Sequence, residues 1–125
     1  MLHIEIISKI FLITAAVLHV IFYLIESFFW MNPKVYTNFG VLNEDNAKVI
    51  RVFTFNQGFY NLFLSIGAFL AFYFWQVGDP NAEIMIWYSC LFMIGAALVL
   101  LFSAPRSIVG ALIQGLPPLL ALIFY

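Results

Sequence analysis

Four long apolar runs decide what this chain can fold into. They cover residues 10–30, 52–75, 84–102 and 108–124. A helix needs roughly 20 apolar residues to cross the hydrocarbon core of a bilayer, with a range of about 17–25. Backbone groups in that core must find partners within the protein, so single runs of this length cross it as α-helices. The runs therefore predict an all-α integral membrane protein built as a four-helix bundle.

The composition supports a membrane protein and excludes some other classes. Hydrophobic residues make up 65% of the chain and charged residues 9%, whereas ordinary soluble domains carry about 25% charged residues. The net charge of -1 provides no basic surface for nucleic acid. No repeat or linker divides the sequence, so we expect a single transmembrane domain over residues 1–125. Glu5 accompanies Lys9 ahead of the first run and no small-residue cleavage site follows it, so we expect the first span to be retained.

The connections between the runs contain residues typical of caps and turns. In the first connection, Asn43 opens a polar stretch that favours the start of a short helix running into the second span. Residues 78–80 have the sequence Gly-Asp-Pro and predict a turn, and residues 103–107 predict a tight reversal. Pro117 and Pro118 lie inside the fourth run, where we expect them to remove backbone hydrogen bonds and bend the helix.

The basic residues are distributed unevenly along the chain. Four lie in the first and third connections and one precedes the first run: Lys34, Lys48, Arg51, Arg106 and, on the other side, Lys9. Because basic residues favour the cytoplasmic side, we expect a multi-pass protein of the cell's inner (cytoplasmic) membrane with both termini outside. The tryptophans, Trp30 among them, lie near the ends of the runs, where interfacial aromatic residues belong.

Polar side chains gather in one half of the predicted bundle. Glu26 is the only formal charge in the first run and lies roughly 6 Å inside its loop end, with His19 roughly 16 Å inside. Seven residues are close to two helical turns, so both side chains share one face. A carboxylate facing lipid is costly, and such residues normally turn toward protein, water or a ligand. Comparable depths on the second and fourth runs are occupied by Asn56, Gln57, Tyr60, Asn61, Arg106 and Gln114.

These comparable depths predict a polar pocket among spans one, two and four that opens toward the cytoplasmic face. Asn61 falls about 7.5 Å deeper than Glu26, a gap that a small head group or a chain of water molecules could bridge. We expect Glu26 to cluster with Asn56 or Gln57, and Gln114 to close the far side of the cavity. The third run carries no charge and no amide, and we expect it to act as a wall or as an oligomer contact.

Each of these residues also has a purely structural interpretation. An intramembrane amide most often bonds a neighbouring helix, at about 0.6 kcal/mol on average, and a histidine such as His19 often packs between helices. Arg106 at a span end can be an orientation anchor, and Glu26 is close enough to the interface to reach water. The coincidence in depth favours a site. No metal and no cofactor is expected, since His19 and Glu26 lie about 10.5 Å apart along the helix and only His3 remains as another nitrogen ligand.

Two motifs resemble those of a known family. The chain reads NQGFYN at residues 56–61 and QGLP at residues 114–117, similar to the N-Q-G-x-Y-N and Q-G-x-P patterns of a widespread bacterial family. That family consists of small four-span membrane proteins and is known as a domain of unknown function. The resemblance covers nearly the whole chain and implies a four-helix membrane fold but no activity. It also implies that these residues occupy motif positions: Glu26, Asn56, Gln57, Tyr60, Asn61 and Gln114. Pro118 departs from the small residue that the pattern has there.

Three functions fit these observations. In the first, the pocket binds a membrane lipid or another small lipophilic or amphiphilic molecule, and an isomerase- or hydrolase-type enzyme would also alter it, with Glu26 as acid or base and His19 as a second catalytic candidate. The ligand-binding candidates are then Asn56, Gln57, Tyr60, Asn61, Arg106 and Gln114. The second function is a proton-coupled exporter of lipophilic cations, and the third is a structural or assembly subunit. Whether the protein is an enzyme, and whether it forms a homo-oligomer, stays open.

Overall fold

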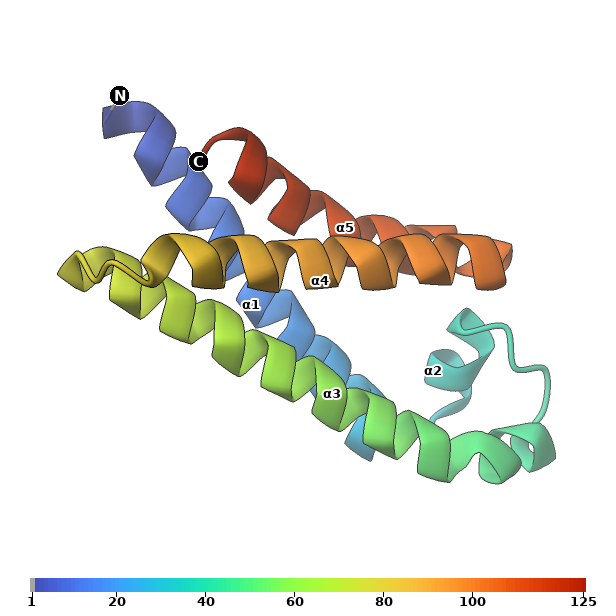
Figure 1. Ribbon diagram of the computed structural model, residues 1–125. Coiled ribbons are helices and arrows are strands. Elements are labelled where there is room, and N and C mark those ends of the chain that lie inside the picture. The colour runs from blue at the N-terminus through green and yellow to red at the C-terminus, as the bar shows by residue number, and fades with distance from the viewer. Residues whose placement is uncertain (1) are drawn as a thin grey trace.

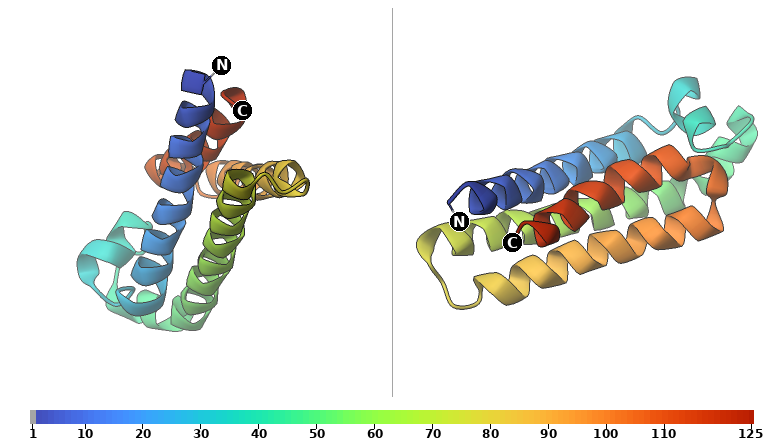
Figure 2. Two further views of the ribbon diagram at one scale, coloured as in Figure 1. Left: turned by 90° about the vertical axis from the view of Figure 1, so that its left-hand side faces the viewer. Right: turned by 90° about the horizontal axis from the view of Figure 1, so that it is seen from above.

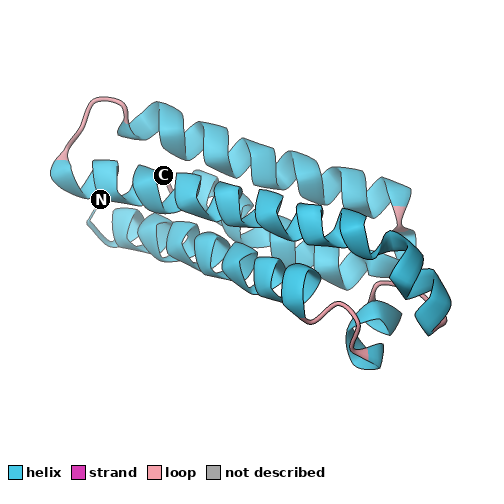
Figure 3. Ribbon diagram, turned by 90° about the horizontal axis from the view of Figure 1, so that it is seen from below, coloured by secondary structure: helices cyan, strands magenta, loops and turns pink. Residues whose placement is uncertain are grey.

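The computed structural model describes residues 2–125, and every regular element in that range is a helix (Figure 3). The elements are α1 (Leu2–Phe28), α2 (Pro33–Asn38), α3 (Glu44–Val77), α4 (Ala82–Ser103), a 3-10 turn η1 (Pro105–Ser107) and α5 (Ile108–Ile123). The segments long and apolar enough to cross a membrane are His3–Phe28, Glu44–Val77, Ala82–Ser103 and Pro105–Ile123. The prediction of an all-α protein with four spans packed as a bundle is confirmed.

The four long helices run alternately up and down (Figure 1). Both chain ends and the α3–α4 turn lie at one end of the bundle, here called the terminal end (Figure 2). The short helix α2 and the α4–α5 turn lie at the other, here called the loop end (Figure 1). Helix α1 packs mainly on α3, and α4 mainly on α5. The bundle therefore consists of two helix pairs, and which end faces the cytoplasm stays a prediction.

The caps at the two ends of α3 agree with the sequence, although the helix is longer than its apolar run. Asn43 Oδ1 accepts a hydrogen bond of 2.9 Å from the backbone N–H of Asn46. From there the helix continues for 34 residues, so the predicted short helix and the second span are one element. Gly78 ends it with φ +71°, a left-handed conformation that glycine adopts without strain. Helix α1 likewise reaches back to Leu2, well before residue 10.

Small side chains bring the helices together at the terminal end. The buried core there consists of Leu12, Ala15, Ala16, Ala68, Ala71, Ile86, Cys90, Met93 and Ala121. Small residues let helix backbones approach closely, which favours helix association in lipid. Ser8 Oγ donates to the carbonyl oxygen of Ala121 over 2.7 Å, and so supplies a partner near the C-terminus of α5, where carbonyls lack helical donors. Pro117 and Pro118 do not interrupt α5, and Pro118 is fully buried in the bundle.

A second buried cluster ties the first connection to α3. It contains Trp30, Tyr36 and Ala47, and Trp30 Nε1 donates to the carbonyl oxygen of Ala47 over 3.0 Å. Asn32 accepts a backbone hydrogen bond at the start of α2, with Pro33 in the first helical turn, where its missing N–H has no cost. Trp30 is 3% exposed, so its side chain anchors the first connection to α3, and its expected place at the membrane interface stays a prediction.

Candidate functional site

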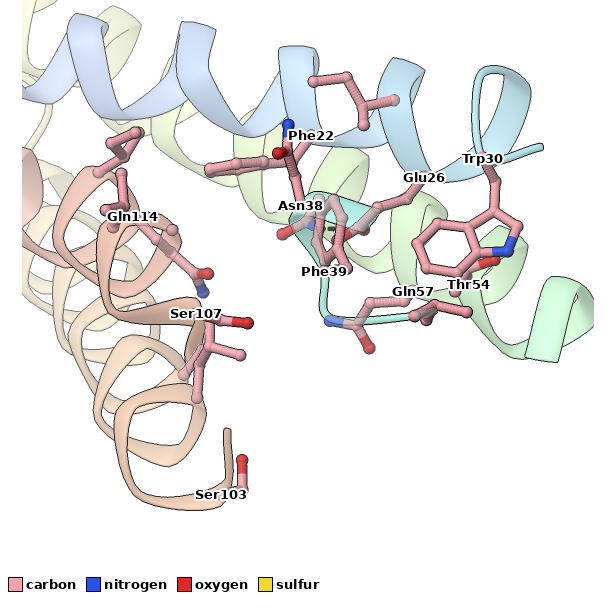
Figure 4. A pocket seen from close by; sticks show the side chains of 18 of the residues that line it. Phe22, Glu26, Trp30, Asn38, Phe39, Thr54, Gln57, Ser103, Ser107 and Gln114 are labelled. Carbon is pink, nitrogen blue, oxygen red and sulfur yellow. Dashed lines mark hydrogen bonds between the residues drawn. The ribbon is translucent and has the colours of Figure 1, made fainter. Parts of the chain in front are cut away.

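A cavity of about 920 Å³ lies at the loop end, where the α1–α3 pair separates from the α4–α5 pair (Figure 4). All four long helices contribute to its wall, and Asn38 and Phe39 from the first connection cover part of it. The lining is mostly apolar. Its size lies within the range of pockets for small molecules, roughly 300–1,000 Å³. Five of the predicted site residues line it: Glu26, Gln57, Asn61, Arg106 and Gln114.

Glu26 and Asn61 form a buried hydrogen bond in the wall of this cavity. Asn61 Nδ2 donates to Glu26 Oε2 over 2.8 Å, and the two residues are 9% and 4% exposed. Gly58 makes the contact possible, because a Cβ there would overlap Ser27 Oγ and lie 3.0 Å from the carbonyl oxygen of Tyr23. A side chain at that position would require Ser27 Oγ and the adjoining backbone of α1 to shift. Asn61, about one turn further along α3, is thereby brought within reach of Glu26.

The Glu26 carboxylate has no basic partner within the described chain. The ion pairs between residues 2 and 125 are Glu5–Lys9, Glu44–Lys48 and Asp45–Lys48. Arg106 lines the same cavity but belongs to η1, which joins the other helix pair. A carboxylate bonded to one amide keeps lone pairs for a further donor, and a buried charge without compensation is costly. The site can therefore accept a hydrogen bond from a hydroxyl or amine, or hold a proton.

The direct contact between Glu26 and Asn61 corrects the expected gap in depth between them. Side chains of an α-helix tilt toward its N-terminus. Because α1 and α3 are antiparallel, Glu26 tilts toward the terminal end and Asn61 toward the loop end. The two side chains converge and close the difference between their backbone levels. No head group or water chain is needed to connect them.

The face of α3 that lines the cavity is narrower than the predicted arc. Gln57 and Asn61, four residues apart, both line the cavity. Asn56 and Tyr60 form the neighbouring row, which lies outside the cavity lining and is exposed on the outside of the bundle, with Tyr60 59% exposed. A rotation of about 100° per residue is enough to turn that row away from α1. Glu26 therefore bonds Asn61 rather than Asn56, and shares the cavity with Gln57.

Gln114 faces the cavity from the opposite helix pair. Figure 4 places its side chain across the cavity from Glu26 and Trp30. The next residue explains this orientation, because Gly115 packs against α4, and a Cβ there would lie 2.7 Å from the Cβ of Ala97. With Gly115 against α4, Gln114 projects in another direction. Gln114 therefore lines the side of the cavity opposite Glu26, and its role in closing a ligand site stays a prediction.

His19 lies deeper in the bundle and does not line the cavity. Its side chain is fully buried, and Nδ1 lies 2.8 Å from the carbonyl oxygen of Ala15. A carbonyl only accepts, so Nδ1 carries the proton and donates it. Nε2 is buried and has no hydrogen-bond partner in the described chain. His19 is therefore not placed to exchange a proton with a molecule in the cavity.

The apolar runs do not predict the contribution of the first connection to the cavity wall. Asn38 and Phe39 line the cavity, and Trp30 adds its indole to the same wall. The signal that could have found α2 is the Asn32-Pro33 pair, a helix cap followed by proline. Within residues 2–125 no three His, Cys, Asp or Glu side chains are placed to hold a metal ion.

Comparison with known proteins identifies a family but no activity. Residues 13–125 match the model of a family described as "Protein of unknown function (DUF1304)". No curated protein and no solved structure matches the chain. The match spans all four long helices and includes every residue of the cavity lining.

Proposed function

The chain belongs to the DUF1304 family, whose description assigns no activity, and we propose that it binds a small lipophilic or amphiphilic molecule inside the membrane. The molecule occupies the cavity at the loop end, and its polar group lies at the Glu26–Asn61 pair. One observation carries this proposal: a buried carboxylate, bonded to a single amide, in the wall of a cavity of about 920 Å³. A residue with only a packing role would not need a cavity beside it.

The lining suggests the chemistry of the ligand. Phe22, Ile25 and Phe39 are suited to an apolar body, which binding sites commonly enclose with apolar and aromatic side chains. Glu26 favours a ligand that brings a hydrogen-bond donor, such as a hydroxyl or an amine, because the chain itself supplies no basic partner there. Gln114 can bond a second polar group across the cavity. We therefore expect an amphiphile with its donor group at Glu26.

A catalytic form of this function would use Glu26 as the acid or base. Among the described residues that line the cavity, Glu26 is the one with a carboxylate, and neither His19 nor Tyr60 is part of the lining. A single group that takes and returns a proton suits an isomerisation better than a hydrolysis, which also needs an activated nucleophile. The binding proposal does not depend on this step.

The proposal is tested by what copurifies with the protein. Extracts of the detergent-purified protein are analysed by mass spectrometry for Glu26→Gln, Asn61→Leu and the unmodified chain. Glu26→Gln keeps the size of the side chain and removes its charge, so we expect this variant to fold. The amount of copurifying molecule per protein should fall at least about tenfold, which corresponds to about 1.4 kcal/mol of binding free energy. Thermal unfolding in the same detergent monitors the fold.

Asn56→Leu is the matched control, because Asn56 is an amide on the same helix that lies outside the cavity. It should retain the copurifying molecule at the unmodified level. If Glu26→Gln and Asn61→Leu lose stability yet retain whatever copurifies, the pair holds helices together and the binding proposal is wrong. Equal loss in the Asn56 variant would also overturn it, since the effect would then not belong to the cavity.

A further inference from the structure

A second pair of polar groups lies in the middle of the bundle, outside the cavity. Within the described chain, the buried side-chain atoms that lack a hydrogen-bond partner are His19 Nε2 and Ser65 Oγ. Their side chains are 0% and 1% exposed, and neither residue lines the cavity. Buried polar groups nearly always have a partner, because an unpaired one loses its hydrogen bonds to water without replacement. Both of these atoms therefore need a hydrogen-bond partner that the protein itself does not supply within the described residues.

The register of α1 and α3 places these two residues at the same level. Gly58 packs against Tyr23 and Ser27, and so lies level with the residues between them on α1. Advancing seven residues along α3 reaches Ser65, and the same distance back along antiparallel α1 ends about one residue, or about 1.5 Å, from His19. Both residues also lie on the inward faces defined by Glu26 and Asn61, since they are seven and four residues away from them.

The chemistry of the two atoms is complementary to one water molecule. His19 Nδ1 holds the ring proton for Ala15, so Nε2 of the neutral ring is an acceptor. Ser65 Oγ can donate or accept. The two atoms do not bond each other directly, and both are enclosed, so a partner shared by both has to be small. We infer that His19 and Ser65 together bind one buried water molecule, which donates to Nε2 and hydrogen-bonds Oγ.

Asn61, one turn away on α3, is the candidate for a third partner of this water. Buried waters typically make about three hydrogen bonds. Asn61 precedes Ser65 by four residues on the same face of α3, and its Nδ2 donates to Glu26, which leaves Oδ1 as an acceptor. The water then links His19 and Ser65 to the Glu26–Asn61 pair through Asn61. His19 becomes a positioning residue for the cavity rather than a catalytic one, and the site exists whether or not the cavity binds a ligand.

The test is nuclear magnetic resonance of the whole protein in detergent, labelled with nitrogen-15 at histidine. His3→Gln serves as the background, because it leaves His19 as the only imidazole. In that background we expect the Nε2 signal of a hydrogen-bonded acceptor. Ser65→Ala should shift it toward the signal of an unbonded imidazole nitrogen, and Ser65→Cys, which keeps a weak donor, should shift it less. Ser89→Ala is the control, because Ser89 is a buried serine on α4 and should leave the signal unchanged.

A double-mutant cycle provides the second readout. His19→Phe and Ser65→Ala are combined, and unfolding is measured in mixed micelles with sodium dodecyl sulfate. A shared water predicts that the effects of the two substitutions on the unfolding equilibrium constant are coupled by at least about threefold. Independent effects, together with an Nε2 signal that Ser65→Ala leaves unchanged, would overturn the inference. Greater stability of Ser65→Ala in both backgrounds would overturn it too, since it would show a dry, unpaired hydroxyl.

Discussion

The two ends of the bundle are built from similar helices but differ in how closely those helices approach. At the terminal end, alanines from α1, α3 and α5 lie in one buried core. At the loop end, the α1–α3 pair and the α4–α5 pair separate around a cavity of about 920 Å³. The side chains that face the gap there include Glu26, Gln57 and Gln114, which are long and polar.

The difference between the two ends follows from the size and polarity of the side chains between the helices. Lipid is as apolar as leucine, so helices in a membrane associate through close packing and hydrogen bonds rather than by leaving water. Alanine and glycine permit that packing, whereas long polar side chains need partners and space. At the loop end the glycines act only within each pair: Gly58 between α1 and α3, and Gly115 between α4 and α5. The pairs are therefore tight and the space between them is not.

The largest expected effect is a contrast between truncations at the two ends. Leu12 is fully buried at the terminal end, so Leu12→Ala leaves a cavity and should lower the free energy of unfolding by about 3 kcal/mol. Ile25 already lines a cavity, so Ile25→Ala should cost less than half as much. Unfolding by sodium dodecyl sulfate in mixed micelles measures both. Equal losses would mean that the loop end is packed as densely as the terminal end.

A smaller difference in unfolding free energy is expected between alanine substitutions at two glycines, one packed within a helix pair and one with free space around it. A Cβ at Gly58 would overlap Ser27, so Gly58→Ala should destabilise the protein by about 1–3 kcal/mol. Nothing lies within 4 Å of a Cβ at Gly95, so Gly95→Ala should stabilise α4 by about 0.5–1 kcal/mol. The same unfolding measurement gives both signs. A neutral Gly58→Ala would show that α1 and α3 separate without cost, and that Gly58 does not set their distance.

A substitution of Trp30 tests whether its hydrogen bond to Ala47 holds the first connection in place at the loop end. Trp30→Phe removes the hydrogen bond to Ala47 and should cost about 1 kcal/mol, while amide hydrogen exchange increases across residues 31–43. Trp87→Phe is the control, since Trp87 is 41% exposed and should change neither measurement. Unchanged exchange in the Trp30 variant would mean that this bond does not hold the connection in place.

Much of the fold could be predicted because it depends on local patterns. The apolar runs locate four helices, and Asn43 and Gly78 mark the ends of α3 through capping chemistry that acts over a few residues. The start of α2 has a local signal in Asn32-Pro33, but the burial of Trp30 and Tyr36 could not be predicted in the same way. Their burial depends on Ala47, which lies on another helix, and no local pattern reports that contact.

The sequence predicted how deep the candidate residues lie in the bundle, but not in which direction their side chains point around each helix. Rise per residue placed Glu26, Gln57 and Gln114 in one half of the bundle, and all three line the cavity. The rotation of each helix about its own axis depends on packing against its neighbours, and for α3 that packing is set by Gly58. Asn56 and Tyr60 therefore turned out to face outward, one step of about 100° from the lining row.

The smallest expected effect concerns a contact that strengthens the terminal end from outside its core. Lys9 Nζ lies 4.8 Å from the centre of the Trp75 ring, and Trp75 packs edge to face against Tyr125. Lys9 also pairs with Glu5 over 2.6 Å, one turn away on α1. Lys9→Gln removes both contacts and should lower the free energy of unfolding by about 0.5–1 kcal/mol. Glu5→Gln removes only the ion pair and should lower the free energy of unfolding by about 0.3 kcal/mol. In about 0.5 M salt most of this difference should disappear, because salt screens the ion pair. If the Lys9 and Glu5 variants lose equal stability, the aromatic contact contributes nothing to the stability of the terminal end.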